Sequence, residues 1–324
     1  MNTVVRRSIA CLGLGCALAL PVASQAEPPL AWPAKQINWI VGFVPGGSAD
    51  VLTRVAAQDL AQRTGLNVVV ENKPGASGAI ALQIVARSKA SDGSLITVPG
   101  PLIYPTPQPA IGKELAPVML MAQGPMVIVG PAKQALPSLA DVLADARKRP
   151  EAWSYGSSGN GTSQHLAGEL LNQVAGTRIV HVPYKGGGQA VSDVTGGQIP
   201  LAILGSSPVL PQIKAGALKA YAVTTPQRLA ALPEVPTVAE SGFPGYAASQ
   251  WFSVAASPDI DAAVLDQLNA ALQKTLQSPA FQTAVTTAGM IAAGGSPADL
   301  QRFIADDTAK WQKLLDSGAI KLAN

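Results

Sequence analysis

The stretch VGFVPGGSADVLTRVAAQDLA at residues 41–61 decides how the rest of the chain is interpreted. Residues 37–44 form an apolar run that predicts a buried strand, and the PGG at residues 45–47 ends it. Beyond the glycines, apolar residues recur at helical spacing, at Leu52, Val55, Ala56 and Leu60. Because the first amides of a helix have no intrahelical partner, a strand that enters a helix through glycines predicts a place where an anion can bind.

Three later stretches repeat this order of strand, glycine-containing turn and helix. They read GSSGNGTSQHLAGELL from residue 156, PYKGGGQAVSDV from residue 183 and GSSPVLPQIKAG from residue 205. Repeated alternation of strands and helices favours an α/β fold with mainly parallel sheets. Two amphipathic helices are expected near the end of the chain, at residues 262–276 and 297–315.

The N-terminal residues predict export. Arg6 and Arg7 precede an apolar segment at residues 8–23, and the small residues before Glu27 suit cleavage by a signal peptidase. We therefore expect a cleavable signal peptide at residues 1–26, with a retained N-terminal anchor as the alternative. Both cysteines lie within this segment, so the exported part is expected to contain neither a disulfide nor a thiolate.

Composition argues against several classes of partner. The chain has 23 Lys and Arg residues against 20 Asp and Glu residues, and removal of Arg6 and Arg7 brings the balance closer to neutral. Without a basic block, nucleic acid and anionic membrane surfaces are not expected to be partners. The two histidines, His165 and His181, match no common metal-ligand spacing, so neither a metal nor a cofactor is expected.

Catalytic motifs are incomplete. In GSSGNG, Asn160 replaces the last glycine of a nucleophile elbow. The dinucleotide fingerprint fails because Gln164 and Val191 occupy the sixth positions counted from Gly159 and Gly186. Asp50, in the first turn of its helix, is expected to act as a cap and dipole partner more often than as a general base. The sequence therefore predicts that the protein is not an enzyme.

The glycine-rich turns then remain to be explained. They carry neutral hydroxyl groups that can bind an anion in a nearly neutral protein, on Ser48, Ser157, Ser158, Thr162 and Ser163. Ordinary strand-to-helix turns also favour Gly and Ser, so the pattern alone leaves both interpretations open.

Longer stretches resemble one family of receptors. From residue 37 onward the chain is similar to the solute receptors of the tripartite tricarboxylate transporters, the Bug family. The resemblance rests on FVPGGSAD (43–50), VVVENKPGASG (68–78), YGSSGNGTSQHLAG (155–168), HVPYKGGGQAVSDVTGGQI (181–199), GALKAYAVTTPQR (216–228), LPEVPTVAESG (232–242) and FIADDTAKW (303–311).

This resemblance implies a type II-like periplasmic binding protein with a ligand cleft between two α/β lobes. Residues 27–123 and 250–324 would form lobe one, and residues 124–249 lobe two. PGGSAD and GSSGNGTS would face each other across the cleft. The ligand-binding residues that it implies are Phe43, Gly46, Gly47, Ser48, Ala49, Asp50, Gly75, Ala76, Ser157, Ser158, Gly159, Thr162, Ser163, His165, Lys185, Gly205 and Ser206.

It further implies a monomeric periplasmic receptor that delivers a small carboxylate to the permease subunits of a tripartite transporter. The acid could be a mono- or dicarboxylate, aliphatic or aromatic. Lys185 could pair with a second carboxylate or be solvated. An orphan sensor that serves a signalling partner is the alternative function, and a small-molecule hydrolase a weaker one.

Overall fold

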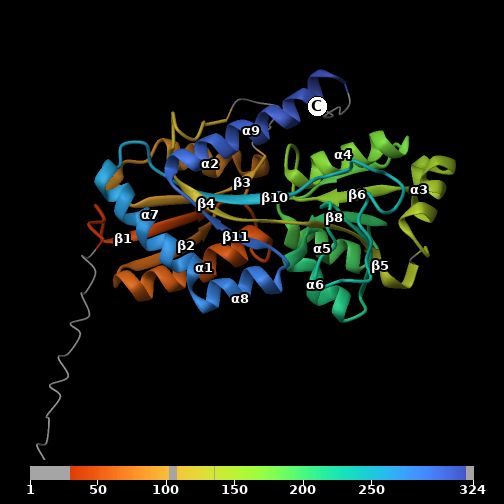
Figure 1. The fold of residues 1–324 in the computed structure, drawn as a ribbon, viewed down its shortest axis with the longest axis horizontal. Coiled ribbons are helices and arrows are strands. Elements are labelled where there is room, and N and C mark those ends of the chain that lie inside the picture. Colours follow the sequence, from red (N-terminus) through yellow and green to blue (C-terminus); the bar gives the residue numbers. More distant parts are fainter. Residues whose placement is uncertain (1–29, 102–107, 135, 319–324) are drawn as a thin grey trace, which may run out of the picture.

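The computed structural model describes residues 30–101, 108–134 and 136–318. The predicted signal peptide at residues 1–26 lies outside these residues and stays a prediction. The described chain folds into two α/β lobes that lie side by side, each built on one sheet (Figure 1).

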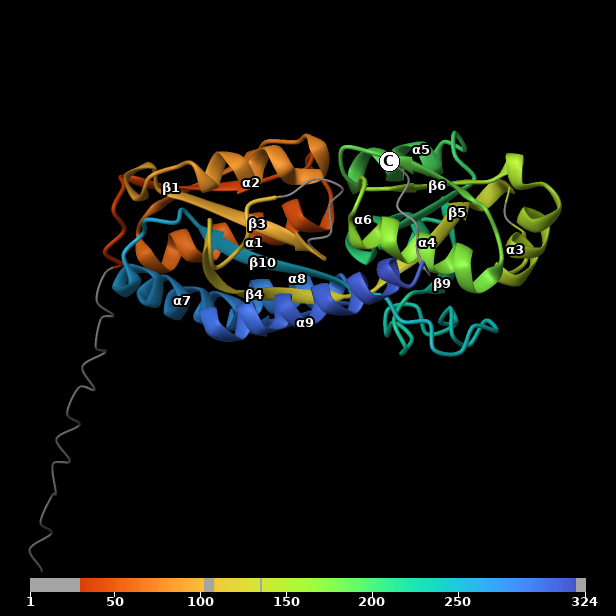
Figure 2. The ribbon, with the colours of Figure 1, turned by 90° about the horizontal axis from the view of Figure 1, so that it is seen from above.

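The first lobe is built on a six-stranded sheet in the order β11-β4-β10-β3-β1-β2. Its strands are β1 (Gln36–Val41), β2 (Asn67–Asn72), β3 (Ser94–Gly100), β4 (Ala116–Gly124), β10 (Gln250–Ala256) and β11 (Ile291–Gly294). One face packs on α1 (Ser48–Thr64), α7 (Ala262–Gln277) and α8 (Pro279–Thr287), and the other on α2 (Ala79–Ala86) and α9 (Pro297–Asp316). Figure 2 shows the same lobe from above, with α1 and α2 separated by β1 and β3.

Strand β1 illustrates why this lobe is a three-layer structure. Ile37, Trp39 and Val41 are buried in the cluster that contains α1, whereas Ile40 is buried in the cluster that contains α2. Successive side chains of a strand point to opposite faces, so a strand with buried apolar residues on both faces must be covered on both sides. Helix α1 ends at Gly65, whose φ of 71° is typical of a glycine that caps the C-terminus of a helix.

The second lobe is built on a five-stranded sheet in the order β7-β6-β8-β5-β9. Its strands are β5 (Met126–Pro131), β6 (Ser154–Ser157), β7 (Val180–Pro183), β8 (Leu201–Gly205) and β9 (Leu218–Val223). Helices α3 (Leu139–Lys148) and α4 (Ser163–Ala175) cover one face, and α5 (Gly187–Thr195) and α6 (Ser206–Lys214) cover the other. Short 3-10 helices occur in both lobes: η1 (Ala76–Gly78) and η2 (Ala90–Asp92) in the first, and η3 (Ala132–Gln134) and η4 (Pro150–Ala152) in the second.

Both sheets are mixed, which corrects the expectation of mainly parallel sheets. Strands β1, β2 and β3 pair in parallel, as do β6, β7 and β8. Strand β10 runs antiparallel to β3 and β4, and β5 runs antiparallel to β8 and β9. Strands β4 and β5 follow each other directly across Pro125 from one sheet to the other, and β10 returns the chain to the first sheet. Strands β4 and β5 are joined directly, without a helix between them, and they lie in different sheets, so the rule of parallel pairing does not apply to this connection.

Helix α9 connects the lobes a third time and lies along both of them (Figure 1). Near its middle, Asp307 accepts a hydrogen bond of 2.8 Å from the indole of Trp251 in β10. Further along, Trp311 is buried in a core cluster of the second lobe. The helix therefore packs against both halves of the molecule.

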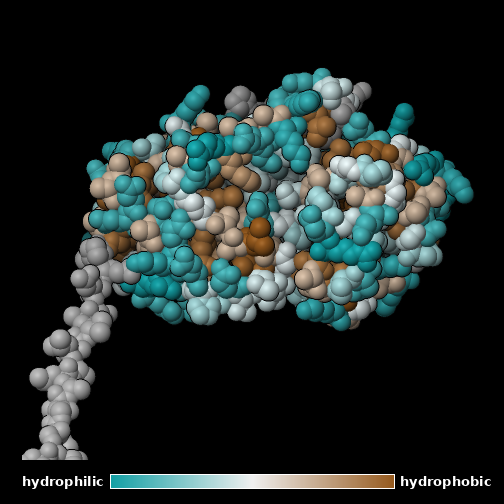
Figure 3. Space-filling model, viewed as in Figure 1, coloured by the Kyte–Doolittle hydropathy of each residue, from teal (hydrophilic) through white to brown (hydrophobic). Residues whose placement is uncertain are grey.

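A membrane-spanning helix requires both length and apolar character. The face drawn in Figure 3 mixes hydrophilic and hydrophobic residues over both lobes. Within residues 30–101, 108–134 and 136–318, no helix combines the length and apolar character needed to cross a membrane.

Candidate ligand-binding site

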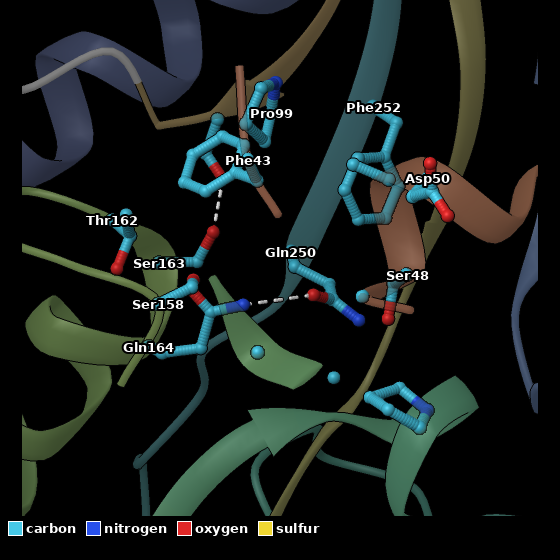
Figure 4. A pocket seen from close by; sticks show the side chains of 16 residues that line it. Phe43, Ser48, Asp50, Pro99, Ser158, Thr162, Ser163, Gln164, Gln250 and Phe252 are labelled. Carbon is cyan, nitrogen blue, oxygen red and sulfur yellow. Dashed lines mark hydrogen bonds between the residues drawn. The ribbon is translucent and has the colours of Figure 1, made fainter. Parts of the chain in front are cut away.

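A cavity lies between the two lobes and is lined by residues from both (Figure 4). It holds about 520 Å³ of space between atoms, including open solvent at its mouth. Its lining residues are Phe43, Gly47, Ser48, Ala49, Asp50, Pro99, Gly100, Ser158, Thr162, Ser163, Gln164, Gly187, Gly205, Pro208, Gln250 and Phe252.

The loop before α1 forms one side of this cavity. Gly46 has a φ of 88°, which favours glycine. Gly47 is the N-cap residue of α1, and no side chain of the described chain caps the helix there. The first amides of α1 are therefore available as donors at the cavity, at the end of the helix that carries a partial positive charge.

Asp50 holds this loop in place. Its carboxylate accepts hydrogen bonds from the Gly46 amide at 3.1 Å, from Arg54 Nε at 3.0 Å and from Asn72 Nδ2 at 2.9 Å. Burial acts to raise the pKa of Asp50, but the bonds from Arg54, Asn72 and Gly46 together outweigh it and lower the pKa. Asp50 is consequently an anionic structural group whose oxygens are already bonded, which is a poor general base.

Two hydroxyl groups on this side have no partner in the described chain. Ser48 Oγ is buried without a hydrogen bond, and the residue is 7% exposed where it lines the cavity. Ser206 Oγ, at the first position of α6 and outside the cavity lining, is also buried and unpartnered. Since buried polar groups are nearly always hydrogen-bonded, an unpartnered hydroxyl in the wall of a cavity indicates a place for a ligand atom.

On the opposite side, at the start of α4, the hydroxyl groups are already bonded within the protein. Thr162 Oγ1 donates to the Gly159 carbonyl at 2.7 Å and caps α4 by accepting from the His165 amide. Ser158 Oγ donates to Gln164 Oε1 at 2.8 Å, and Ser163 Oγ donates to the Gly100 carbonyl in the first lobe. This side of the cavity is fixed by its own hydrogen bonds.

Two glutamines join the lobes across the cavity. Gln164 Nε2 donates to Gln250 Oε1 at 3.2 Å, and the two side chains point toward each other in Figure 4. Gln250 Nε2 donates in turn to the carbonyl of Pro125, at the crossover between β4 and β5. The pair therefore links the start of α4 to the two strands that connect the lobes.

The two stretches expected to face each other both line the cavity, but their direct contacts are with other loops. The PGG loop lies against the KGGG loop before α5, where the Val44 amide donates to the Lys185 carbonyl at 3.2 Å. The GSSGNGTS turn lies against Gly100 and Ser77 of the first lobe.

The implied site residues therefore divide into two groups. Those that line the cavity are Phe43, Gly47, Ser48, Ala49, Asp50, Ser158, Thr162, Ser163 and Gly205. Those outside its lining are Gly46, Gly75, Ala76, Ser157, Gly159, His165, Lys185 and Ser206. Lining residues that the sequence did not single out are Pro99, Gly100, Gln164, Gly187, Pro208, Gln250 and Phe252. Gln164 and Gly187 lie inside stretches already singled out, whereas Pro99, Gln250 and Phe252 lie on β3 and β10 without any glycine-turn signal.

His165 lies behind the GSSGNGTS turn and stacks on His181, with ring centroids 3.8 Å apart. Its Nδ1 accepts a hydrogen bond from the Gly161 amide at 3.1 Å. Burial lowers the pKa of His165 to about 4, and burial together with the neighbouring ring lowers the pKa of His181 to about 3. Both rings are neutral near pH 7 and support the turn.

Lys185 is exposed on the loop before α5 and does not line the cavity. Within the described residues, no group of three or more His, Cys, Asp or Glu side chains is arranged to hold a metal ion. The described lining consists of amides, hydroxyls, apolar walls and the carboxylate of Asp50, which is bonded within the protein.

A two-lobed α/β fold with a cavity between the lobes defines the class of periplasmic binding proteins. Solved structures of this class superpose closely. "Structure of a periplasmic transporter" has a TM-score of 0.84 at 34% identity and covers 90% of this chain and 100% of that chain. R. palustris Rpa4515 with adipate has a TM-score of 0.84 at 32% identity and covers 89% of this chain and 99% of that chain.

Within this class, the chain belongs to the tripartite tricarboxylate transporter family receptors, whose family model matches residues 52–320. It is 33% identical to Protein BugT of Bordetella pertussis over 98% of both chains. It is 35% identical to the UPF0065 protein in the tcbD-tcbE intergenic region of Pseudomonas sp. strain P51, over 93% of this chain and 92% of that protein. Membership of the family confirms the resemblance found in the sequence.

Proposed function

We propose that the chain is a periplasmic receptor that binds a small carboxylate in the cavity between its lobes. One observation carries this proposal: the buried, unpartnered hydroxyl of Ser48 lies at the uncapped start of α1, in the wall of the cavity. A carboxylate there would accept hydrogen bonds from the hydroxyl and from the first amides of the helix, where the helix dipole favours a negative charge. The binding of adipate by a relative that is 32% identical supports the same class of ligand.

The chemistry of the described residues also favours binding over catalysis. Ser157 Oγ and His181 Nε2 form a hydrogen bond of 2.6 Å that resembles a nucleophile and its base. However, Ser157 is 0% exposed, so no substrate carbonyl can reach its hydroxyl. The pair instead supports the turn before α4, and we infer that the protein is not a hydrolase.

A thermal-shift screen tests the ligand class. Small carboxylates should raise the unfolding temperature, and the rise should grow with concentration above the dissociation constant. Sugars and cationic amines of similar size are the controls. Stabilisation by either control class, with none by carboxylates, would remove the proposal.

We further propose that the receptor is exported by its signal peptide, acts as a monomer and delivers its ligand to the membrane subunits of a tripartite transporter. Family membership supports this role. The test is uptake of a labelled acid by spheroplasts that contain the large and small permease subunits, with and without added receptor. Uptake that does not depend on the receptor would contradict delivery.

A further inference from the structure

The cavity provides donors unevenly. On the side of α1, the Ser48 hydroxyl and the first helix amides are without partners in the described chain. On the side of α4, the hydroxyls of Ser158, Thr162 and Ser163 already donate to protein oxygens. Figure 4 shows these two sets on opposite sides of the cavity. The described residues thus provide unused donors at the α1 side, and no matching set of unused hydroxyls among them faces these donors.

The charges in the cavity point the same way. None of the described residues that line it is Lys, Arg or His. Asp50 is the one ionisable side chain among the described lining residues, and its negative charge is compensated by Arg54. A second carboxylate on the ligand would find no cation with which to pair among the described lining residues.

The remaining wall is apolar. Phe43 and Phe252 are 5% and 3% exposed, and they lie with Pro99 on one side of the cavity in Figure 4. Pro208, at the third position of α6, adds an apolar surface and has no amide hydrogen to donate. Such walls favour an uncharged hydrocarbon body, and burial of an unpaired carboxylate against them is costly.

We propose that this cavity selects monocarboxylates with an apolar body over dicarboxylates of the same size. This selectivity rests on the proposed function, because it takes carboxylate binding at the start of α1 as given. The single carboxylate lies on the α1 amides and Ser48, and the hydrocarbon body lies against Phe43, Phe252 and the prolines.

Two matched pairs of acids test the selectivity by isothermal titration calorimetry at neutral pH and constant ionic strength. Hexanoate and adipate share six carbons and differ by one terminal carboxylate, and 4-methylbenzoate and terephthalate share eight carbons and differ in the same way. Within a pair that binds, the monocarboxylate should bind about tenfold more tightly or better, since the dicarboxylate must bury an unpaired charge. Adipate is the most demanding competitor because a relative binds it.

The outcomes separate the two proposals. Dicarboxylates that bind as tightly as their monocarboxylate partners, or more tightly, would overturn the selectivity and leave carboxylate binding intact. Binding confined to other acids that carry two or more carboxylates would overturn it in the same way. Failure of every carboxylate in a broad panel to bind would remove the proposed function itself.

A variant tests where the ligand body lies. Gln164 lines the wall across from Ser48, so Gln164→Lys introduces a cation that can pair with a second carboxylate. Adipate should gain about tenfold relative to hexanoate in this variant, whereas Gln164→Met, of similar length and uncharged, should keep the original preference. An unchanged preference in folded Gln164→Lys protein would show that the far end of the ligand does not reach this wall, and would overturn the placement.

Discussion

Substitution of Ser48 by alanine separates a ligand-binding role of this hydroxyl from a structural one. In most buried positions, loss of a hydroxyl costs stability because a hydrogen bond is lost. Ser48 Oγ makes no hydrogen bond to the described protein, so Ser48→Ala removes a polar group and breaks nothing. The free energy of unfolding should therefore stay the same or rise by up to about 2 kcal/mol, the cost of a buried unsatisfied group.

Ligand affinity should change in the opposite direction. A hydrogen bond to a charged acceptor such as a carboxylate contributes about 1.5 to 3 kcal/mol. Loss of the Ser48 bond should accordingly weaken carboxylate binding by roughly 10- to 150-fold. Calorimetric titration measures the affinity, and urea unfolding without ligand measures the stability.

Thr53→Val is the matched control on the same helix. Thr53 Oγ1 donates to the Ala49 carbonyl at 2.6 Å and lies 2.6 Å from Thr97 Oγ1, and the residue is 0% exposed. This control should lose about 1 to 3 kcal/mol of stability and bind ligand almost as the parent does. If Ser48→Ala instead lost stability and kept its affinity, the Ser48 hydroxyl would be a structural group and the reasoning would be refuted.

Three further predictions concern other groups. Gly47→Asp should fold, because an added Cβ lies an ordinary 3.6 Å from the Gly187 amide. Its carboxylate should cap α1 in place of the ligand and abolish carboxylate binding. The control Gly47→Ala cannot cap the helix and should change the affinity by less than about fivefold. Lys185→Met should leave the affinity for mono- and dicarboxylates within about twofold, since this exposed side chain lies outside the cavity lining, and a selective loss of dicarboxylate binding would contradict this. The pKa values of His165 and His181 are lowered from 6.5 to about 4 and about 3 in the folded protein. As the pH drops, these histidines therefore bind protons in the unfolded chain before they do so in the folded protein. The free energy of unfolding should accordingly fall as the pH drops from 6.5 toward 3. Unfolding temperatures measured across this range should fall less steeply in a variant with both histidines replaced by asparagine, and equal slopes would show that these rings do not cause the loss.

Much of the fold is predictable from the sequence because its signals are local. Apolar strands followed by glycine turns predict β1 with α1 and β6 with α4. The pairing of β10 with β3 and β4 depends on contacts between segments more than a hundred residues apart. Local pattern contains no information on such pairing, so the mixed sheets could not be predicted in this way.

Some of the residues that line the cavity can likewise be predicted from local sequence signals, and others cannot. Turn residues such as Ser48 and Thr162 are recognisable because glycines and hydroxyl groups have local signatures. Gln250 and Phe252 have none, because they line the cavity through the path of β10 between the lobes. His165 follows a glycine turn in sequence, but the helical direction of α4 places its ring behind the turn, against His181.

The most direct test of the account is a crystal structure of the protein with a bound monocarboxylate such as hexanoate or benzoate. The account predicts that the carboxylate oxygens lie within hydrogen-bond distance of Ser48 Oγ and of amides at the start of α1, with the hydrocarbon body against Phe43 and Phe252. A carboxylate at the start of α4 instead, or a ligand bound in the hollow beside His165 and His181, would contradict it.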